Sequence, residues 1–189
     1  MPADFTIVVP VKGGPDAKSR FGGPDREALA LAMALDTVEA ALAIARVIVV
    51  TPRELAAEFE ALGASVLDDP GMGLLAAIER GLAAVPAEHG SAVLLGDVPG
   101  AQPTELAAVL AAATERVMVA DADGVGTVLI AAPPGVTHTP GFGADSRETH
   151  RASGYRELLD PWPGLRRDVD VTANLEGLAT GPRTTALLR

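Results

Sequence analysis

The sequence predicts an α/β fold in three layers: a mostly parallel, twisted sheet with helices on both faces. Short β-branched runs alternate with helical segments through about the first 110 residues, which is the pattern of a parallel sheet with covering helices. Hydrophobic residues make up 48% of the chain and aromatic residues only 3%, a composition that suits helices packed on a sheet. A length of 189 residues predicts a single domain over 1–189.

The first half of the chain is expected to begin with a strand. Residues 5–11 form a short β-branched run closed by a Gly-Gly-Pro loop, which is typical of a buried strand. A helix is predicted over 25–43 with Asp25 as its N-cap, followed by a second buried strand at 46–51. Pro52 can begin the next helix, to about residue 62, because the N–H that proline lacks would be unsatisfied there. A short strand at 65–67, a loop at 68–73 and a helix over 74–85 complete this half.

The second half begins with a strand in residues 91–100 that ends in a Gly-Asp-Val-Pro-Gly break. Pro103 starts another helix, and strands at 116–120 and 127–133 flank an Asp-Gly turn. Residues 133–143 are irregular and predict an active-site loop, because too little chain follows for a second domain. A helix is expected over 145–160, a last strand over 166–171, and then a short helix to about 178. The C-terminal residues 183–189 are expected to be solvated.

Charge and composition exclude several classes of protein. The net charge of −10 is the wrong sign for non-specific binding of nucleic acid. The absence of cysteine excludes disulfides and thiolate metal sites. No basic region leads into a long apolar segment, so we expect neither a signal peptide nor a membrane span, and a cytoplasmic protein. A polyphosphate ligand stays possible through local cations or a bound metal.

Polar residues follow the predicted strands, and ligands of open α/β sheets bind beyond the carboxyl ends of the strands. Cations and glycines gather after the first strand, and carboxylates follow the later ones. These residues are, in chain order, Lys12, Asp69, Gly71, Asp97, Asp121, Asp123, Asp168 and Asp170. Cations and backbone N–H groups can hold phosphates, whereas carboxylates can hold Mg²⁺, a hard ion that prefers oxygen ligands. The arrangement therefore indicates a metal–triphosphate site.

Each motif taken alone also has a simpler interpretation. The loop over residues 12–23 offers backbone N–H groups and positive charge to an anion, but a flexible, solvated connection fits it equally well; its glycines and cations are Lys12, Gly13, Gly14, Lys18, Arg20, Gly22 and Gly23. Asp97 fits a turn as well as a rigid carboxylate. The Asp123-Gly124 pair favours a plain turn, whereas the functional interpretation gives Gly124, Gly126 and Thr127 to a small anion.

Two further stretches are ambiguous in the same way. Asp168 and Asp170 lie two residues apart on a predicted strand, so both face one side, and a cation between them would relieve their repulsion. Asp170 can instead cap the helix that follows, so we favour a metal role for Asp168. Gly143 precedes a helix start at Asp145 or Ser146, which can attract an anion or be capped in the ordinary way. The three histidines show no metal-ligand spacing.

Five motifs in this order carry a resemblance to a known family: VPVKGGPDAKSRF, LLGDVPG, DGVGT, FGADSRETH and WPGLRRDVDV. Together they resemble the guanylyltransferases that make the activated precursor of the deazaflavin coenzyme F-420. The resemblance runs from Thr6 to about Leu178 and is closest to the actinobacterial branch, which uses phosphoenolpyruvate. It implies a fold like that of the molybdenum-cofactor guanylyltransferases, which is a nucleotide-diphospho-sugar transferase-like fold.

The resemblance implies a reaction and a set of site residues. An enzyme of that family joins GTP to a three-carbon phosphorylated acid, with release of pyrophosphate and with Mg²⁺ as cofactor. The resemblance assigns the triphosphate to Lys12, Lys18 and Arg20, and the guanine or ribose to the loop with Gly71 and Gly73. Gly73 stands where the family commonly has Asn. Mg²⁺ is assigned to Asp97 and Asp168, with Asp170 as a weaker candidate, and phosphoenolpyruvate to Thr127, Gly143 and Ser146. The residues expected to be catalytic are Lys12, Lys18, Asp97 and Asp168.

The family also leaves alternatives open. The archaeal branch is assigned 2-phospho-L-lactate, and other enzymes of the fold act on molybdopterin or sugar phosphates. A non-catalytic nucleotide-binding module is less expected because Lys12, Asp97 and Asp168 are all present. A dehydrogenase is less expected still, since no GxGxxG motif follows the first strand. We also expect a homodimer and a downstream transferase that takes the product, with no nucleic-acid or membrane partner.

Overall fold

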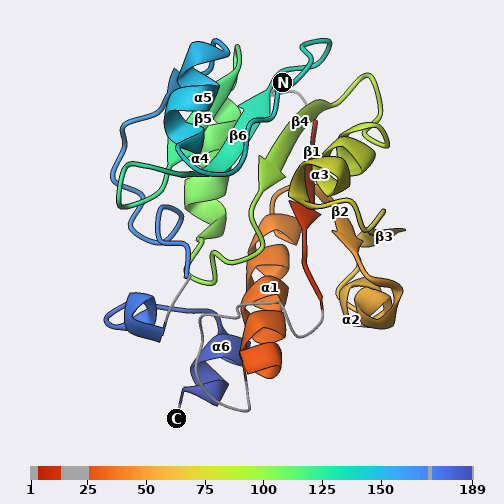
Figure 1. Cartoon of the computed structure of the whole chain (residues 1–189), viewed down its shortest axis with the longest axis vertical. Helices are drawn as coiled ribbons and strands as arrows, with labels where there is room; N and C mark the ends of the chain where they lie inside the picture. The colour runs from red at the N-terminus through yellow and green to blue at the C-terminus, as the bar shows by residue number, and fades with distance from the viewer. Residues whose placement is uncertain (1–3, 14–25, 170–171, 189) are drawn as a thin grey trace.

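A seven-stranded sheet forms the centre of the computed structural model, which describes residues 4–13, 26–169 and 172–188. The strand order is β3-β2-β1-β4-β6-β5-β7 (Figure 1). The strands are β1 Phe5–Pro10, β2 Arg46–Thr51, β3 Ser65–Asp68, β4 Gly90–Leu94, β5 Val117–Ala120, β6 Thr127–Ala132 and β7 Arg156–Glu157.

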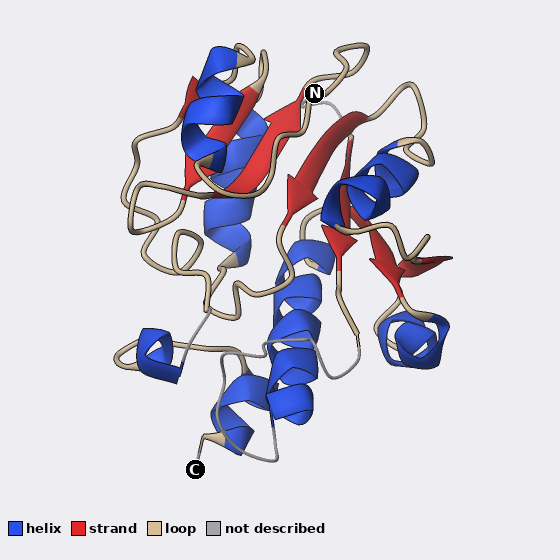
Figure 2. Ribbon diagram, viewed as in Figure 1, coloured by secondary structure: helices blue, strands red, loops and turns tan. Residues whose placement is uncertain are grey.

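The sheet is mostly parallel, as predicted. In the central pairings, Val8 of β1 lies opposite Ile48 of β2 on one side and Val93 of β4 on the other. Of the described strands, β6 alone runs against its neighbours, β4 and β5. Figure 2 shows the arrows of β1 and β4 ending toward the half of the molecule that holds the C-terminus. The carboxyl ends of β1 to β5 therefore meet at one edge of the sheet, where β6 begins.

Helices cover both faces, which confirms the three-layer prediction. Successive strand residues face opposite sides, so Ile7 and Val9 pack with one set of helices while Val8 packs with another. The first face carries α1 Arg26–Leu42, α2 Ala56–Glu60 and α4 Pro103–Ala112, and the second carries α3 Leu74–Leu82 and the segments that flank α5 Ser146–Ala152. On the second face α3 lies very close to the sheet, because at Gly81 a Cβ atom would collide with the side chain of Val8.

The C-terminal segment packs on α1, so the prediction of a solvated terminus is wrong for Thr184, which is buried, while Leu187 and Leu188 are exposed as predicted. It contains the 3-10 helix η2 Thr172–Leu175 and the helix α6 Pro182–Leu187, which lies beside α1 in Figure 1. The buried Asp36 carboxylate of α1 accepts hydrogen bonds from the backbone N–H groups of Thr184 at 2.8 Å and Arg183 at 3.2 Å. This contact could not be predicted from the sequence, because Asp36 and Thr184 are far apart in the chain.

Two predicted elements differ from the observed ones. The predicted helix over 145–160 ends at Ala152, because Gly154 adopts φ +85° and turns the chain toward β7. Residues 166–169 of the predicted last strand do not form a strand, and 170–171 lie outside the described residues. Val169 is buried there against Met33 and Leu175 instead of in the sheet. Polar and apolar residues do alternate here as in a strand, but the apolar Val169 packs against helix α1 instead of entering the sheet.

Two shorter elements also end earlier than predicted. The helix expected from Pro52 to about residue 62 is the 3-10 helix η1 Arg53–Leu55 followed by α2. The helix after the 68–73 loop ends at Leu82. No helix in the described part of the chain combines the length and hydropathy that a membrane crossing requires.

Candidate active site

Lys12 lies just beyond the carboxyl end of β1 and is exposed. Its segment is fixed to the neighbouring strand, since the Val11 N–H donates to the Val50 carbonyl at 2.8 Å. The loop after β4 packs against the same point: a Cβ atom on Gly96 would lie 3.2 Å from the Pro10 carbonyl oxygen. The chain thus brings the residue before Asp97 against the end of β1, next to the segment that carries Lys12.

Asp97 and Asp168, predicted as metal ligands, are brought together by the main chain. The Val169 N–H donates to the Asp97 carbonyl at 2.9 Å, so the residue that follows Asp168 is bonded to Asp97 itself. The buried Val169 side chain holds this contact from the α1 side. Both aspartates are partly exposed. The loop is tied down once more by the Gly181 N–H, which donates to the Pro99 carbonyl at 2.9 Å.

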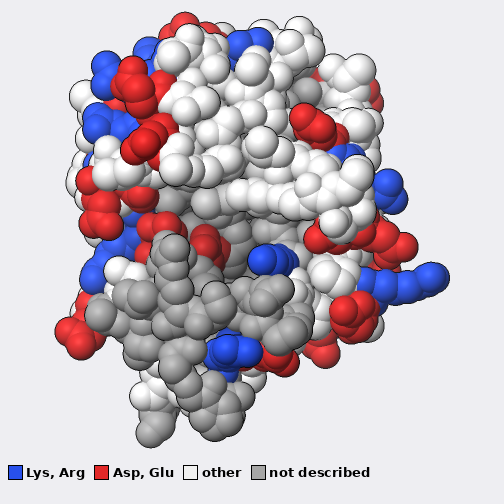
Figure 3. Space-filling model, viewed as in Figure 1, with Lys and Arg blue, Asp and Glu red and all other residues white. Residues whose placement is uncertain are grey.

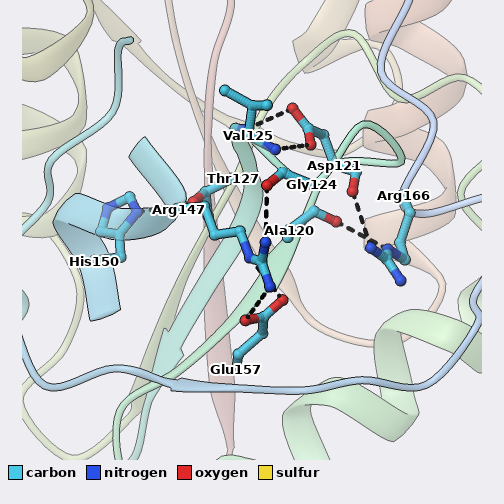
Figure 4. A network of polar contacts seen from close by, with 10 residues as sticks. Ala120, Asp121, Gly124, Val125, Thr127, Arg147, His150, Glu157 and Arg166 are labelled. Carbon is cyan, nitrogen blue, oxygen red and sulfur yellow. Dashed lines mark hydrogen bonds and ion pairs between the residues drawn. The ribbon is translucent and has the colours of Figure 1, made fainter. Parts of the chain in front are cut away.

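Two arginines before Asp168 anchor the same segment. Arg166 donates from Nε to the Ala120 carbonyl at 3.1 Å and from Nη2 to the Asp121 carbonyl at 3.0 Å (Figure 4). Arg167 donates from Nη2 to the Glu176 carbonyl at 3.0 Å. These guanidinium groups therefore bind the backbone at the end of β5 and after η2, and they fix the chain that carries Asp168.

The turn after β5 is closed by its own carboxylate. Asp121 accepts the N–H of Val125 at Oδ1 (2.9 Å) and the N–H of Gly126 at Oδ2 (2.6 Å), as Figure 4 shows. The side chain thus occupies the N–H groups that the anion interpretation of this turn gave to a ligand at Gly126. The structure therefore supports the plain turn that the Asp123-Gly124 pair favours.

Arg147 joins this turn to α5. Its guanidinium makes two hydrogen bonds of 3.0 Å to the Glu157 carboxylate and a third of 2.9 Å to the Gly124 carbonyl. The bond to Glu157 raises the pKa of Arg147 above its ordinary value. Its backbone N–H also donates to the Val125 carbonyl at 3.1 Å. The start of α5 is therefore held at the same edge of the sheet as Lys12 and Asp97.

The three residues predicted to bind phosphoenolpyruvate lie on neighbouring segments. Thr127 is the first residue of β6 and is 3% exposed, and Ser146 is the first residue of α5 and is 2% exposed. Gly143 lies in the exposed loop before α5, with φ +144°. Their proximity comes through His150, which hydrogen-bonds to Thr127 and to the N–H of Gly141. Sequence reasoning missed His150; its position four residues after Ser146 on one helix was the available signal.

The predicted nucleotide loops are described only in part. Lys18 and Arg20 lie outside the described residues, as does Asp170. Gly71 and Gly73 are in the loop between β3 and α3 with φ +71° and +92°, where other residues would be strained. The loop is shaped by Asp69, whose Oδ1 accepts the N–H of Gly71 at 2.9 Å. The described residues include no group of three or more His, Cys, Asp or Glu side chains arranged to hold a metal ion.

Charged side chains are spread unevenly over the surface. On the face drawn in Figure 3, Lys, Arg, Asp and Glu side chains lie mainly along the two flanks, and the upper middle is largely uncharged. A pocket of about 500 Å³ opens beside the end of the loop after β4, with Gly100, Ala122, Arg166 and Arg167 among its lining residues. Gly177, Leu178 and Ala179 of the C-terminal segment also line this pocket.

Comparison with known proteins identifies the family. The sequence model of the MobA-like NTP transferase domain matches residues 19–160. The phosphoenolpyruvate guanylyltransferase of Salinispora arenicola is 48% identical, over 97% of this chain and 92% of its own length. That of Streptomyces coelicolor is also 48% identical, over 97% and 95%.

Solved structures share the fold at low sequence identity. A structure assigned as a nucleotide-diphospho-sugar transferase from Desulfovibrio desulfuricans G20 matches with a TM-score of 0.67 and 17% identity, and covers 99% of this chain and 94% of that one. Rv0371c of Mycobacterium tuberculosis, solved as a complex with manganese, matches with a TM-score of 0.51 and 20% identity over 93% and 97%. The chain belongs to the MobA-like NTP transferase family and, within it, to the phosphoenolpyruvate guanylyltransferases.

Proposed function

We propose that this protein transfers the guanylyl group of GTP to phosphoenolpyruvate, as a cytoplasmic step of coenzyme F-420 biosynthesis, with residues 1–189 acting as one nucleotidyltransferase domain. The products are enolpyruvyl-diphospho-5′-guanosine and pyrophosphate. Relatives of that name are 48% identical over 97% of the chain. The structural observation that carries the proposal is the 2.9 Å hydrogen bond from Val169 N–H to the Asp97 carbonyl, which joins the two segments of the predicted metal site.

The proposed chemistry is an in-line displacement at phosphorus. A phosphate oxygen of phosphoenolpyruvate forms a bond to the α-phosphorus of GTP, the bond from that phosphorus to the β-phosphate oxygen breaks, and pyrophosphate leaves with the electron pair. Both reactants are anions, and two unit charges ~4 Å apart repel by ~4 kcal/mol at an effective dielectric near 20. The main task of the protein is therefore to offset negative charge and to align the two substrates.

Asp97 and Asp168 would hold a divalent ion, with Asp170 as a third candidate. The fit rests on the donor set: two partly exposed carboxylates on bonded segments suit Mg²⁺, which typically takes one or two carboxylates plus substrate phosphates. The related Rv0371c structure contains manganese, another divalent ion. When bound, such an ion supplies charge neutralisation and orientation of phosphate oxygens.

The other site residues would bind and orient the substrates. Lys12, Lys18 and Arg20 offset charge on the triphosphate and on the departing pyrophosphate, while the loop with Gly71 and Gly73 receives the guanine or ribose. The exposed position of Lys12 beyond β1 is consistent with this role. Thr127, Gly143 and Ser146 hold the three-carbon acid. In support, His150 lies on the helix that begins at Ser146 and hydrogen-bonds to Thr127 and to Gly141, two residues before Gly143.

No strong general base is required, because a phosphate monoester is already ionised near neutral pH. The histidines of this half of the molecule agree with that chemistry. Burial lowers the pKa of His138 and of His150 to about 4, and both ring nitrogens of each are engaged in hydrogen bonds. These side chains are therefore suited to structural hydrogen bonding and not to proton transfer at pH 7.

The test is an assay of pyrophosphate release with purified protein and Mg²⁺. We expect release from GTP in the presence of phosphoenolpyruvate, much slower release with 2-phospho-L-lactate, and none with GTP alone. Faster release with 2-phospho-L-lactate would reassign the substrate, and no release with either acid would refute the proposal. The product carries an activated diphosphate, so we propose that a downstream transferase consumes it. We further propose that the protein acts as a homodimer.

A further inference from the structure

His150 lies on α5, fully buried between two aromatic side chains and close to Thr127, one of the residues predicted to bind the acid. It is 0% exposed, and its ring meets the edges or faces of Phe142 and Tyr155 at centroid distances of 4.9 and 5.2 Å. Figure 4 shows His150 on α5, facing the beginning of β6 where Thr127 lies. Packing on both sides leaves the ring little freedom to rotate, so its two nitrogens point in fixed directions.

The hydrogen bonds of His150 decide which ring nitrogen carries the proton. The Gly141 backbone N–H, which can only donate, lies 2.9 Å from Nε2, so Nε2 is an unprotonated acceptor. The ring is neutral because burial lowers its pKa to about 4. A neutral ring with a bare Nε2 carries its hydrogen on Nδ1, which lies 3.0 Å from the Thr127 hydroxyl oxygen. Thr127 therefore accepts from His150, and its own hydrogen is left for another acceptor.

The same ring links all three segments predicted to hold the three-carbon acid. It bonds to Thr127 at the start of β6 and to Gly141 two residues before Gly143, and it lies on α5, the helix that begins at Ser146. The contact between the loop and α5 is tight, because a Cβ atom on Gly141 would collide with the side chain of Thr149. A change in the ring would therefore alter the spacing of these segments together.

We propose that His150 is a positioning residue for the acid substrate, an inference that rests on the proposed guanylyl transfer. Its Nδ1–H form turns the Thr127 hydroxyl into a donor toward an anionic oxygen of the three-carbon acid. Its bond to Gly141 and its position on α5, four residues after Ser146, hold the neighbouring acid-binding segments at the matching distance. The residues assigned to the nucleotide lie on the loops after β1 and β3, so we expect the effect of His150 to be confined to the acid.

Two substitutions separate the bonds that His150 makes. Asn places an amide at the position of Nδ1, so His150→Asn can keep the donor to Thr127; Gln places one at the position of Nε2, so His150→Gln keeps only the acceptor for Gly141. We expect His150→Gln to raise the KM for phosphoenolpyruvate about tenfold, the effect of losing one hydrogen bond to an ionised group, with the KM for GTP within about twofold. His150→Asn is expected to raise the KM for phosphoenolpyruvate by less than about threefold.

Two controls distinguish positioning from a loss of stability. His89→Gln breaks a similar buried contact, the 2.8 Å pair of His89 with Thr6, at the opposite edge of the sheet, and should leave both KM values unchanged. In a Thr127→Val background, which removes the hydroxyl, His150→Gln should add less than about twofold to the KM for phosphoenolpyruvate. Parallel increases in both KM values, or full additivity with Thr127→Val, would overturn the positioning role.

Binding and spectroscopy separate this inference from the proposed reaction. Calorimetric titration of phosphoenolpyruvate into the wild type and the two His150 variants repeats the comparison without turnover. Nitrogen NMR of His150 should show Nδ1 protonated and Nε2 bare at pH 7, whereas the opposite tautomer would overturn the inference even in an active enzyme. Failure of the wild type to release pyrophosphate would refute the proposed reaction, and equal calorimetric affinities of the wild type and His150→Gln would refute the role of His150.

Discussion

Asp36→Ala tests whether the C-terminal helix is held by one buried carboxylate. The Asp36 side chain is 1% exposed and accepts two backbone N–H groups of α6, at 2.8 and 3.2 Å, and the Arg183 guanidinium at 3.4 Å. Hydrogen bonds to a charged group contribute roughly 1.5–3 kcal/mol each, and loss of a helix N-cap costs about 1 kcal/mol and up to about 2. The Thr184 N–H would also stay buried without its partner. We therefore expect a loss of about 3 kcal/mol.

Thermal unfolding followed by circular dichroism measures this loss. A domain of this size loses roughly 2–4 °C in Tm per kcal/mol, so Asp36→Ala should unfold about 9 °C below the wild type. Glu39→Ala is the matched control, because Glu39 is 51% exposed and binds the same arginine at 2.7 Å. An exposed ion pair contributes about 0–1 kcal/mol, which predicts a Tm within about 3 °C of the wild type. Equal shifts for the two variants, or a shift below about 3 °C for Asp36→Ala, would refute the reasoning.

Three other changes are expected to have measurable effects. The pKa values of His138 and His150 are lowered from 6.5 to about 4, so the unfolded chain binds more protons and stability is lost as the pH falls below about 6.5. Each histidine should cost about 2 kcal/mol between pH 7 and pH 5, visible in urea unfolding; a His138→Asn variant that kept the full pH dependence would contradict this. Asp97→Ala and Asp168→Ala should lower kcat more than about 100-fold without loss of fold, and near-wild-type rates at saturating Mg²⁺ would count against the metal assignment. Ser146→Ala should weaken phosphoenolpyruvate binding about tenfold and GTP binding much less, as measured by calorimetry; equal losses would remove Ser146 from the acid site.

The core of the fold could be predicted because its signals are local. The β-branched runs of β1 and β2 are buried on both faces, so their composition alone identifies them as interior strands. Pro103 starts α4 as expected. The C-terminal segment could not be predicted in the same way. The six residues of α6 owe their place to Asp36, and the alternating pattern around Val169 reflects packing on α1.

The candidate site also has a part that the sequence predicts and a part that depends on contacts between distant segments. Motifs in order identified Lys12, Asp97, Asp168 and Thr127, and the topology brings their segments to one edge of the sheet. Their roles in the reaction stay predictions. His150 was overlooked because its hydrogen bonds reach residues on other segments, and only its position four residues after Ser146 pointed to it.

The contacts of the C-terminal segment also bear on how different parts of one transferase scaffold can change independently. The match to the MobA-like domain ends at residue 160, yet Asp168 lies beyond that point. Residues 161–188 bind the scaffold through α1, the loop after β4 and the end of β5, and they add no strand in the described residues. Because it adds no strand, this C-terminal segment can change in length or in sequence without altering how the strands of the sheet pair. The part of the chain that the family model matches and the C-terminal segment that carries Asp168 can therefore diverge at different rates.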